Sequence, residues 1–205
     1  MRIFFCLLLL LPLTLLHAQQ YEKILKKCID NFQDGLGQFT KERSAAEVER
    51  RYTVLNECMK GQKFPAFSLT TYKGNKYSST ENANKVVLLH FWSTKSPTCV
   101  AAIPLLNELF ETYKDKDFII LSFSSEELGT LNTFLSKHRV RYNVFGKSKN
   151  LINHQFSTVL GYPTNILLNK KGEIAEYKVG SSLKPEELKK TKEALVRAIE
   201  FELGN

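Results

Sequence analysis

The sequence has few cysteines and histidines, with four of each among 205 residues. His138 and His154 have no cysteine, aspartate or glutamate at metal-ligand spacing, so we expect no metal site and no cofactor. Internal repeats and low-complexity segments are also lacking, which excludes repeat architectures. With 43% hydrophobic residues, the chain is long enough for one domain of ordinary size and an extension.

Long hydrophobic runs are lacking everywhere except at the N-terminus. Arg2 precedes an apolar run over residues 3–16, and Ala18 offers a small residue for cleavage. This pattern predicts a secretory signal peptide over residues 1–18, because the run is too short for an ordinary membrane span. We expect a secreted protein with no stable membrane span after cleavage. An uncleaved N-terminal membrane anchor is the alternative.

The chain carries a formal net charge of +8, but its lysines are scattered. The denser lysine groups do not alternate with aromatic residues as they do in nucleic-acid-binding segments. We therefore expect no nucleic-acid partner. A solvated basic surface of this kind favours acidic partners only weakly.

Removal of the predicted signal peptide leaves three cysteines, which is an odd number: Cys28, Cys58 and Cys99. A secreted protein meets an oxidising compartment, so a disulfide is expected. Residues 19–60 predict two helices, each with one cysteine. We expect a structural Cys28–Cys58 bridge that staples a helical hairpin, with Cys99 free. A bridge from Cys99 to either of the other two cysteines is the alternative.

Residues 61–205 alternate between strand and helix patterns, which favours one α/β domain with a central mixed sheet flanked by helices. The segment 85–92 is almost continuously apolar, as expected of a strand covered on both faces. The other expected elements are a hairpin over 66–70 and 76–78, helices over 100–113, 126–137, 151–156 and 185–203, and strands over 118–123, 144–145, 165–168 and 173–179.

A single thiol, Cys99, stands where the strand 85–92 gives way to a helix. The positive end of a helix macrodipole stabilises a thiolate, whereas burial disfavours it, so both a reactive and an inert thiol remain open. A redox dithiol needs a second cysteine about three residues earlier. That position is Ser96.

The segment Phe91-Trp92-Ser93-Thr94-Lys95-Ser96-Pro97-Thr98-Cys99, followed by Ile103-Pro104, resembles the active-site segment of the TlpA/ResA-type thioredoxin-like proteins. Their usual pattern is Phe-Trp-x-x-Trp-Cys-x-Pro-Cys. Residues 61–69 resemble the family's entry segment, and Gly161-Tyr162-Pro163-Thr164 resembles its cis-proline loop. The resemblance implies a thioredoxin-like fold of the AhpC/TSA–thioredoxin superfamily, preceded here by a short helical hairpin. It also implies a bacterial periplasmic location.

The resemblance assigns roles to the site residues. Ser96 replaces the attacking cysteine, and Cys99 matches the second, more shielded thiol of a degenerate Ser-x-x-Cys motif. We therefore expect impaired two-cysteine exchange and at most monothiol chemistry, with thiol- or disulfide-containing proteins or peptides as partners. A substrate groove is expected from four residues of the two motifs: Trp92, Tyr162, Pro163 and Thr164.

Two other functions remain open. A non-catalytic module would bind a polypeptide in the groove around Pro163 by strand addition. A peroxiredoxin-like peroxidase would use Ser-x-x-Cys, although Trp92 stands where that motif has a proline. His90 lies where thioredoxins commonly have a buried aspartate, so it is either a proton relay for Cys99 or a hydrogen-bonded core histidine.

Overall fold

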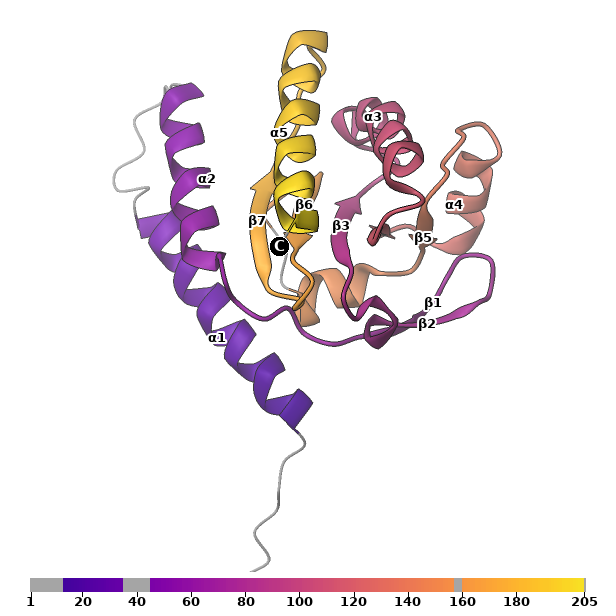
Figure 1. Cartoon of the computed structure of the whole chain (residues 1–205). Coiled ribbons are helices and arrows are strands. Elements are labelled where there is room, and N and C mark those ends of the chain that lie inside the picture. The colour runs from indigo at the N-terminus through magenta and orange to yellow at the C-terminus, as the bar shows by residue number, and fades with distance from the viewer. Residues whose placement is uncertain (1–12, 35–44, 157–159, 205) are drawn as a thin grey trace, which may run out of the picture.

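The computed structural model describes residues 13–34, 45–156 and 160–204. One mixed sheet has the strand order β5-β4-β3-β6-β7 (Figure 1). Strands β3, β4 and β5 run parallel, whereas β6 is antiparallel to both β3 and β7. This arrangement confirms the predicted mixed α/β fold. Its strands are β3 (Val86–Trp92), β4 (Phe118–Ser124), β5 (Asn143–Phe145), β6 (Thr164–Leu168) and β7 (Ile174–Val179).

Side chains of the central strand β3 alternate between two hydrophobic layers, and all seven of its residues are buried. Val86 and Leu88 pack in one layer with helices α3 (Pro97–Tyr113) and α5 (Pro185–Gly204). Val87, Leu89 and Phe91 pack in the other layer. Burial on both faces explains why the strand is almost continuously apolar.

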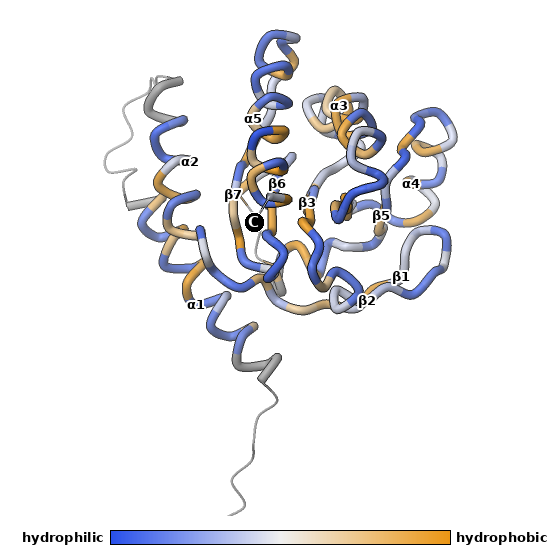
Figure 2. Tube along the Cα trace, in the orientation of Figure 1, coloured by the Kyte–Doolittle hydropathy of each residue, from blue (hydrophilic) through white to orange (hydrophobic). Residues whose placement is uncertain are grey.

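The predicted helical hairpin consists of α1 (Leu13–Asp34) and α2 (Ala45–Met59), joined by a Cys28–Cys58 disulfide whose Cα atoms are 5.7 Å apart. Its buried residues Tyr21 and Leu55 belong to the same hydrophobic cluster as Val87 and Leu89 of the sheet. The hairpin therefore shares the core of the sheet. Figure 2 shows both helices striped with hydrophobic and hydrophilic residues, as expected when one face is buried.

Helix α1 begins inside the predicted signal peptide, and residues 1–12 lie outside the described part of the chain. None of the described helices combines the length and the hydrophobicity that a bilayer span requires.

Both edges of the sheet are hydrogen-bonded to other segments. A hairpin of β1 (Ser68–Thr70) and β2 (Lys76–Ser78), followed by a 3-10 helix over Ser79–Asn82, lies beside β5. There the backbone N–H of Tyr72 donates to the Val144 carbonyl at 3.1 Å. At the other edge, the backbone N–H of Tyr177 in β7 donates to Asn56 Oδ1 of α2 at 2.7 Å.

Three of the expected helices differ from the prediction by two residues or more at an end, or in type. Helix α3 begins at Pro97 rather than residue 100, because Ser96 caps it and proline fits the first helical position. Helix α4 spans only Leu128–Leu135, because Glu126 lies in the preceding loop. The segment expected as a helix over 151–156 is one π-helical turn, Leu151–Gln155.

Candidate active site at the start of helix α3

The two residues of the Ser-x-x-Cys motif meet in the first turn of α3. Ser96 has extended backbone angles, φ −95° and ψ 111°, and its Oγ accepts a hydrogen bond from the backbone N–H of Cys99 at 3.4 Å. Ser96 Oγ also lies 3.0 Å from Thr98 Oγ1. A serine at the N-cap normally makes such a bond to the second or third N–H of the helix. The residue in the expected attacking position therefore serves as the helix cap.

The thiol of Cys99 is fully buried, and it is the one free cysteine of the described residues. Burial raises its pKa above the ordinary value, and the nearby charge of Glu126 raises it further. Hydrogen bonds from the Ser96 side chain and the Ser93 backbone act in the opposite direction and lower it. Because burial is the largest of these effects, the helix-start position does not produce an activated thiolate.

Glu126 is a site residue that sequence reasoning missed. Its side chain is buried, and Oε1 accepts hydrogen bonds from the Ser93 hydroxyl at 2.7 Å and the Thr94 backbone N–H at 3.0 Å. The Ser124 hydroxyl donates to Oε2. Glu126 follows β4, and the Ser93 turn follows β3. Because these two strands are parallel neighbours, their carboxyl ends lie side by side at the same end of the sheet. A run of polar residues after two adjacent parallel strands is the signal that points to such a site.

The peptide bond between Tyr162 and Pro163 is cis, and Tyr162 packs against the hydrophobic cluster that contains Cys99. Tyr162 is half-buried, and burial raises its phenol pKa, with further upward effects from the charges of Glu126 and Cys99. A hydrogen bond with Ser125 lowers it. Tyr162 also lines a polar pocket of about 430 Å³, together with Ser93, Lys95, Ser125 and Glu126.

The four residues of the predicted groove differ in how far the fold exposes them. Trp92 is only 1% exposed, because it faces the side of the sheet that α4 covers and packs there against Phe134, with ring centroids 5.5 Å apart. Thr164 is fully buried and lies between β3 and β7, so its backbone is not available to add a strand. Pro163 is buried, and its carbonyl accepts from the Gly180 N–H at 2.7 Å. Of the four residues, only Tyr162 reaches the surface.

His90 lies in the core of the sheet, with its side chain 1% exposed. Its Nδ1 is 2.8 Å from Asn165 Oδ1 on the neighbouring strand β6, and burial lowers its pKa to about 4. The imidazole is therefore uncharged at neutral pH. The groups that shift the pKa of Cys99 are Ser96, Ser93 and Glu126, and His90 is not one of them. A relay function for His90 stays a prediction.

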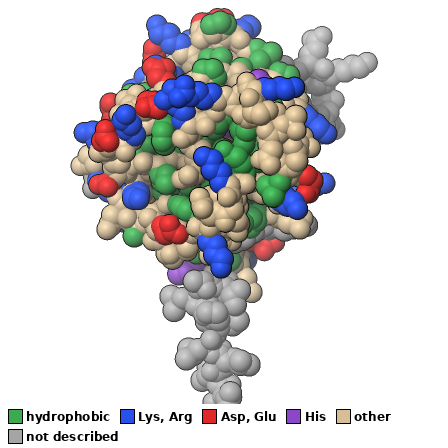
Figure 3. All heavy atoms as spheres, turned by 90° about the vertical axis from the view of Figure 1, so that its right-hand side faces the viewer, with side chains coloured by type: hydrophobic (Ala, Val, Ile, Leu, Met, Phe, Trp, Pro, Cys, Tyr) green, Lys and Arg blue, Asp and Glu red, His purple; other side chains and the backbone are tan. Residues whose placement is uncertain are grey.

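No large patch of one charge is seen among the described residues on the side of the molecule that Figure 3 shows. On the face shown in Figure 3, which is the side of α4 and of the β1–β2 hairpin, basic and acidic side chains are interspersed around hydrophobic ones. Within the described residues, no three histidine, cysteine, aspartate or glutamate side chains gather in a way that would hold a metal ion.

Comparison with solved structures shows the fold. A thiol:disulfide interchange protein of the thioredoxin family from Chlorobium tepidum TLS superposes with a TM-score of 0.59 at 22% identity, covering 69% of this chain and 95% of that one. StoA from Bacillus subtilis gives a TM-score of 0.52 at 23% identity, covering 62% of this chain and 94% of StoA. The fold is therefore thioredoxin-like.

Comparison of sequences shows the family. The model of the AhpC/TSA family matches residues 60–177, more than half of the chain. Thiol-disulfide oxidoreductase ResA from Bacillus thuringiensis is 28% identical over 126 residues, which are 60% of this chain and 72% of ResA. Thioredoxin-like protein YneN from Bacillus subtilis is 33% identical over 129 residues, 62% of this chain and 75% of YneN. With this family match and these relatives, the protein is a thioredoxin-like member of the AhpC/TSA family.

Proposed function

We propose that the protein is a secreted, periplasmic member of the thiol-disulfide oxidoreductase group that has lost autonomous two-cysteine exchange. The observation that carries this proposal is the hydrogen bond from the Cys99 N–H to Ser96 Oγ at 3.4 Å. Ser96 stands where the family pattern has the attacking cysteine, and this bond engages its hydroxyl as the cap of α3. A serine hydroxyl without an activating base does not attack a disulfide at a useful rate.

Residual chemistry at this site is monothiol chemistry of Cys99. In the thiolate form, Cys99 attacks the disulfide of a protein or peptide, forms a mixed disulfide and releases the partner's other sulfur as a thiolate. A second, external thiol then attacks the mixed disulfide and returns Cys99 to its reduced form. The burial and raised pKa of Cys99 make the first step slow. A monothiol cannot complete this cycle without the external thiol.

The test is an insulin-reduction assay with dithiothreitol as electron donor, comparing wild type with Ser96→Cys. We expect wild type to remain at the background rate and Ser96→Cys to exceed it by at least about tenfold, because a dithiol releases its own mixed disulfide. Thr98→Cys is the matched control, since it adds a cysteine to the same turn at a position that the dithiol motif does not use. Turnover by wild type that Ser96→Cys does not improve would contradict the proposal.

Polypeptide binding is the second candidate function, and one observation favours it. Tyr162 is partly exposed beside cis Pro163 and lines the 430 Å³ pocket next to the Ser93 turn. A binding module of this kind needs no reactive thiol. Binding of a reduced, unfolded polypeptide should then survive Cys99→Ser and weaken in Tyr162→Ala. Loss of binding in Cys99→Ser alone would remove this candidate.

Peroxidase function receives no support from the site. A peroxidatic cysteine must be a thiolate that peroxide reaches, whereas Cys99 is fully buried and burial raises its pKa. We therefore expect Cys99 to react with peroxide at the slow rate of an ordinary thiol. Mass spectrometry of the Cys99 peptide after brief exposure to dilute peroxide measures this rate.

A further inference from the structure

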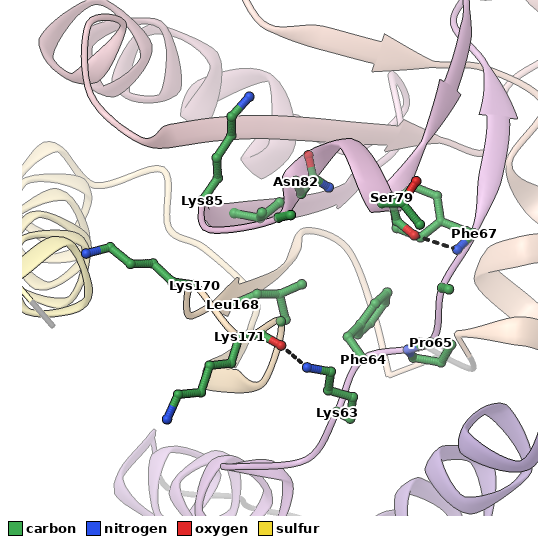
Figure 4. A pocket seen from close by; sticks show the side chains of 15 residues that line it. Lys63, Phe64, Pro65, Phe67, Ser79, Asn82, Lys85, Leu168, Lys170 and Lys171 are labelled. Atoms are coloured by element: carbon green, nitrogen blue, oxygen red, sulfur yellow. Dashed lines mark hydrogen bonds between the residues drawn. The ribbon is translucent and has the colours of Figure 1, made fainter. Parts of the chain in front are cut away.

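A second cavity lies at the end of the sheet opposite Cys99, where strand β3 begins. It has a volume of about 350 Å³, and its inner wall is apolar, with Phe64, Phe67, Val87 and Leu168 (Figure 4). Strand β3 separates the two sites, because Val87 lies near its start and the Ser96–Cys99 turn follows its end. Seven residues of strand span roughly 20 Å.

The remaining wall of this cavity carries charge of one sign. Lys63, Lys85, Lys170 and Lys171 line it, and none of its lining residues is acidic. In the described part of the chain, none of these four lysines pairs with an acidic side chain.

The lysine side chains are arranged around the opening. Figure 4 shows Lys63 beside Phe64, with its ammonium directed at the Lys171 carbonyl to which it donates. Lys170 extends outward, where its ammonium donates to the Leu203 carbonyl at 2.7 Å. Lys85 and Lys171 also extend outward from the cavity. Because each ammonium has three donors, a bond to one carbonyl leaves others for a ligand.

Two features of this site favour an amphiphilic ligand. The apolar wall of the empty cavity forfeits dispersion contacts, and the lysines that line the cavity have no acidic partner among the described residues. A single molecule with an anionic head and an apolar body matches both. Its size is bounded by the volume: a cavity of about 150 Å³ accommodates benzene, so this one has room for about twice that volume.

We propose that the cavity lined by Phe64, Phe67 and Leu168 binds a small amphiphilic carboxylate, with its apolar chain inside and its carboxylate at the opening, towards which the long side chains of Lys63, Lys85 and Lys171 turn on binding. This site is independent of the thiol chemistry, because no residue of the Ser93–Cys99 turn lines it.

The test is calorimetric titration of the full chain with decanoate. We expect saturable binding by wild type and at least about tenfold weaker binding by Lys63→Gln/Lys85→Gln, since two charge-assisted contacts are removed. The control is Lys184→Gln/Lys189→Gln, which removes the same charge from the exposed start of α5 and should bind like wild type. Acetate lacks the chain and decan-1-ol lacks the charge, and each should bind more weakly than decanoate.

A second variant tests the cavity without changing its charge. Ala83 is exposed and lines the cavity, with backbone angles of φ −50° and ψ 129°. Ala83→Phe places a ring over the opening and should weaken decanoate binding, whereas Cys99→Ser should leave it unchanged. The proposal is overturned if decanoate does not bind, if Lys63→Gln/Lys85→Gln binds it as tightly as wild type, or if the lysines matter only for binding to anionic lipid vesicles.

Discussion

The carboxylate of Glu126 accepts a hydrogen bond from the Ser93 hydroxyl at 2.7 Å and thereby ties the loop after β4 to the turn after β3. Thr94 and Ser124 supply two further donors, so that the burial of this carboxylate is compensated. Its negative charge also acts on Cys99, whose pKa it raises. Glu126 thus both positions the active-site turn and disfavours the thiolate.

Glu126→Gln should lower the pKa of Cys99, because the substitution removes the negative charge and keeps nearly the same shape. The amide nitrogen that replaces Oε2 cannot accept the hydrogen bond from the Ser124 hydroxyl. The loss of this bond should lower the unfolding free energy by about 1–2 kcal/mol. The titration of the Cys99 Cβ resonance by carbon-13 NMR measures the pKa. The control is Glu127→Gln, whose side chain is 76% exposed and pairs with Lys147. An unchanged or higher pKa in Glu126→Gln would rule out this electrostatic effect.

Ser96→Ala should destabilise the protein by about 1 kcal/mol, because it removes the oxygen that caps the first turn of α3. Ser96→Asp keeps a capping acceptor and should stay close to wild type in stability. Urea unfolding at neutral pH measures both free energies. If Ser96→Ala were as stable as wild type, the serine would have no capping role, and its presence would need another explanation.

Acidification should destabilise the protein through His90. Burial holds its pKa at about 4, below the ordinary 6.5, so between these values the unfolded chain binds a proton that the folded protein does not. The unfolding free energy therefore falls as the pH drops from 6.5 towards 4, by about 2 kcal/mol between pH 7.5 and pH 5. Urea unfolding at a series of pH values should show this loss. It should be largely absent in His90→Asn and retained in His138→Asn, which changes a partly exposed histidine.

Removal of the Cys28–Cys58 disulfide should weaken the attachment of the helical hairpin. The bond joins residues 30 positions apart, and closing a loop of that length stabilises a protein by about 3–4 kcal/mol in the chain-entropy model. Thermal unfolding of Cys28→Ala/Cys58→Ala should show a lower midpoint. Wild type with the disulfide reduced is the comparison, since it lacks the bond without any change of side-chain volume. Equal midpoints for oxidised and reduced wild type would contradict the expectation.

Much of the fold could be predicted because the relevant signals are local. The apolar run that became β3 and the apolar periodicity of α3 both depend on residues close together in the sequence. The predicted start of α3 is three residues too late, because the prediction takes no account of Ser96 as the helix cap. Proline at the next position is a start signal that could have corrected this.

The site was harder to predict because its contacts join distant segments. Ser93 and Glu126 are 33 positions apart, and they meet only because β3 and β4 are parallel neighbours. The exposure of Trp92 depends in the same way on α4, which covers it in the folded protein. The position of Cys99 at a helix start lowers its pKa, whereas burial raises it. Only the packing of the folded protein shows that burial is the larger effect.

The hydrogen bonds of Tyr72 to Val144 and of Tyr177 to Asn56 have a consequence for association between copies of the chain. Open outer strands are templates on which other chains polymerise. Here the segment after β1 is hydrogen-bonded to the edge strand β5, and helix α2 is hydrogen-bonded to the edge strand β7. Truncation of the N-terminal hairpin would uncover β7, so the shortened protein should precipitate more readily at high concentration even if its sheet remains intact.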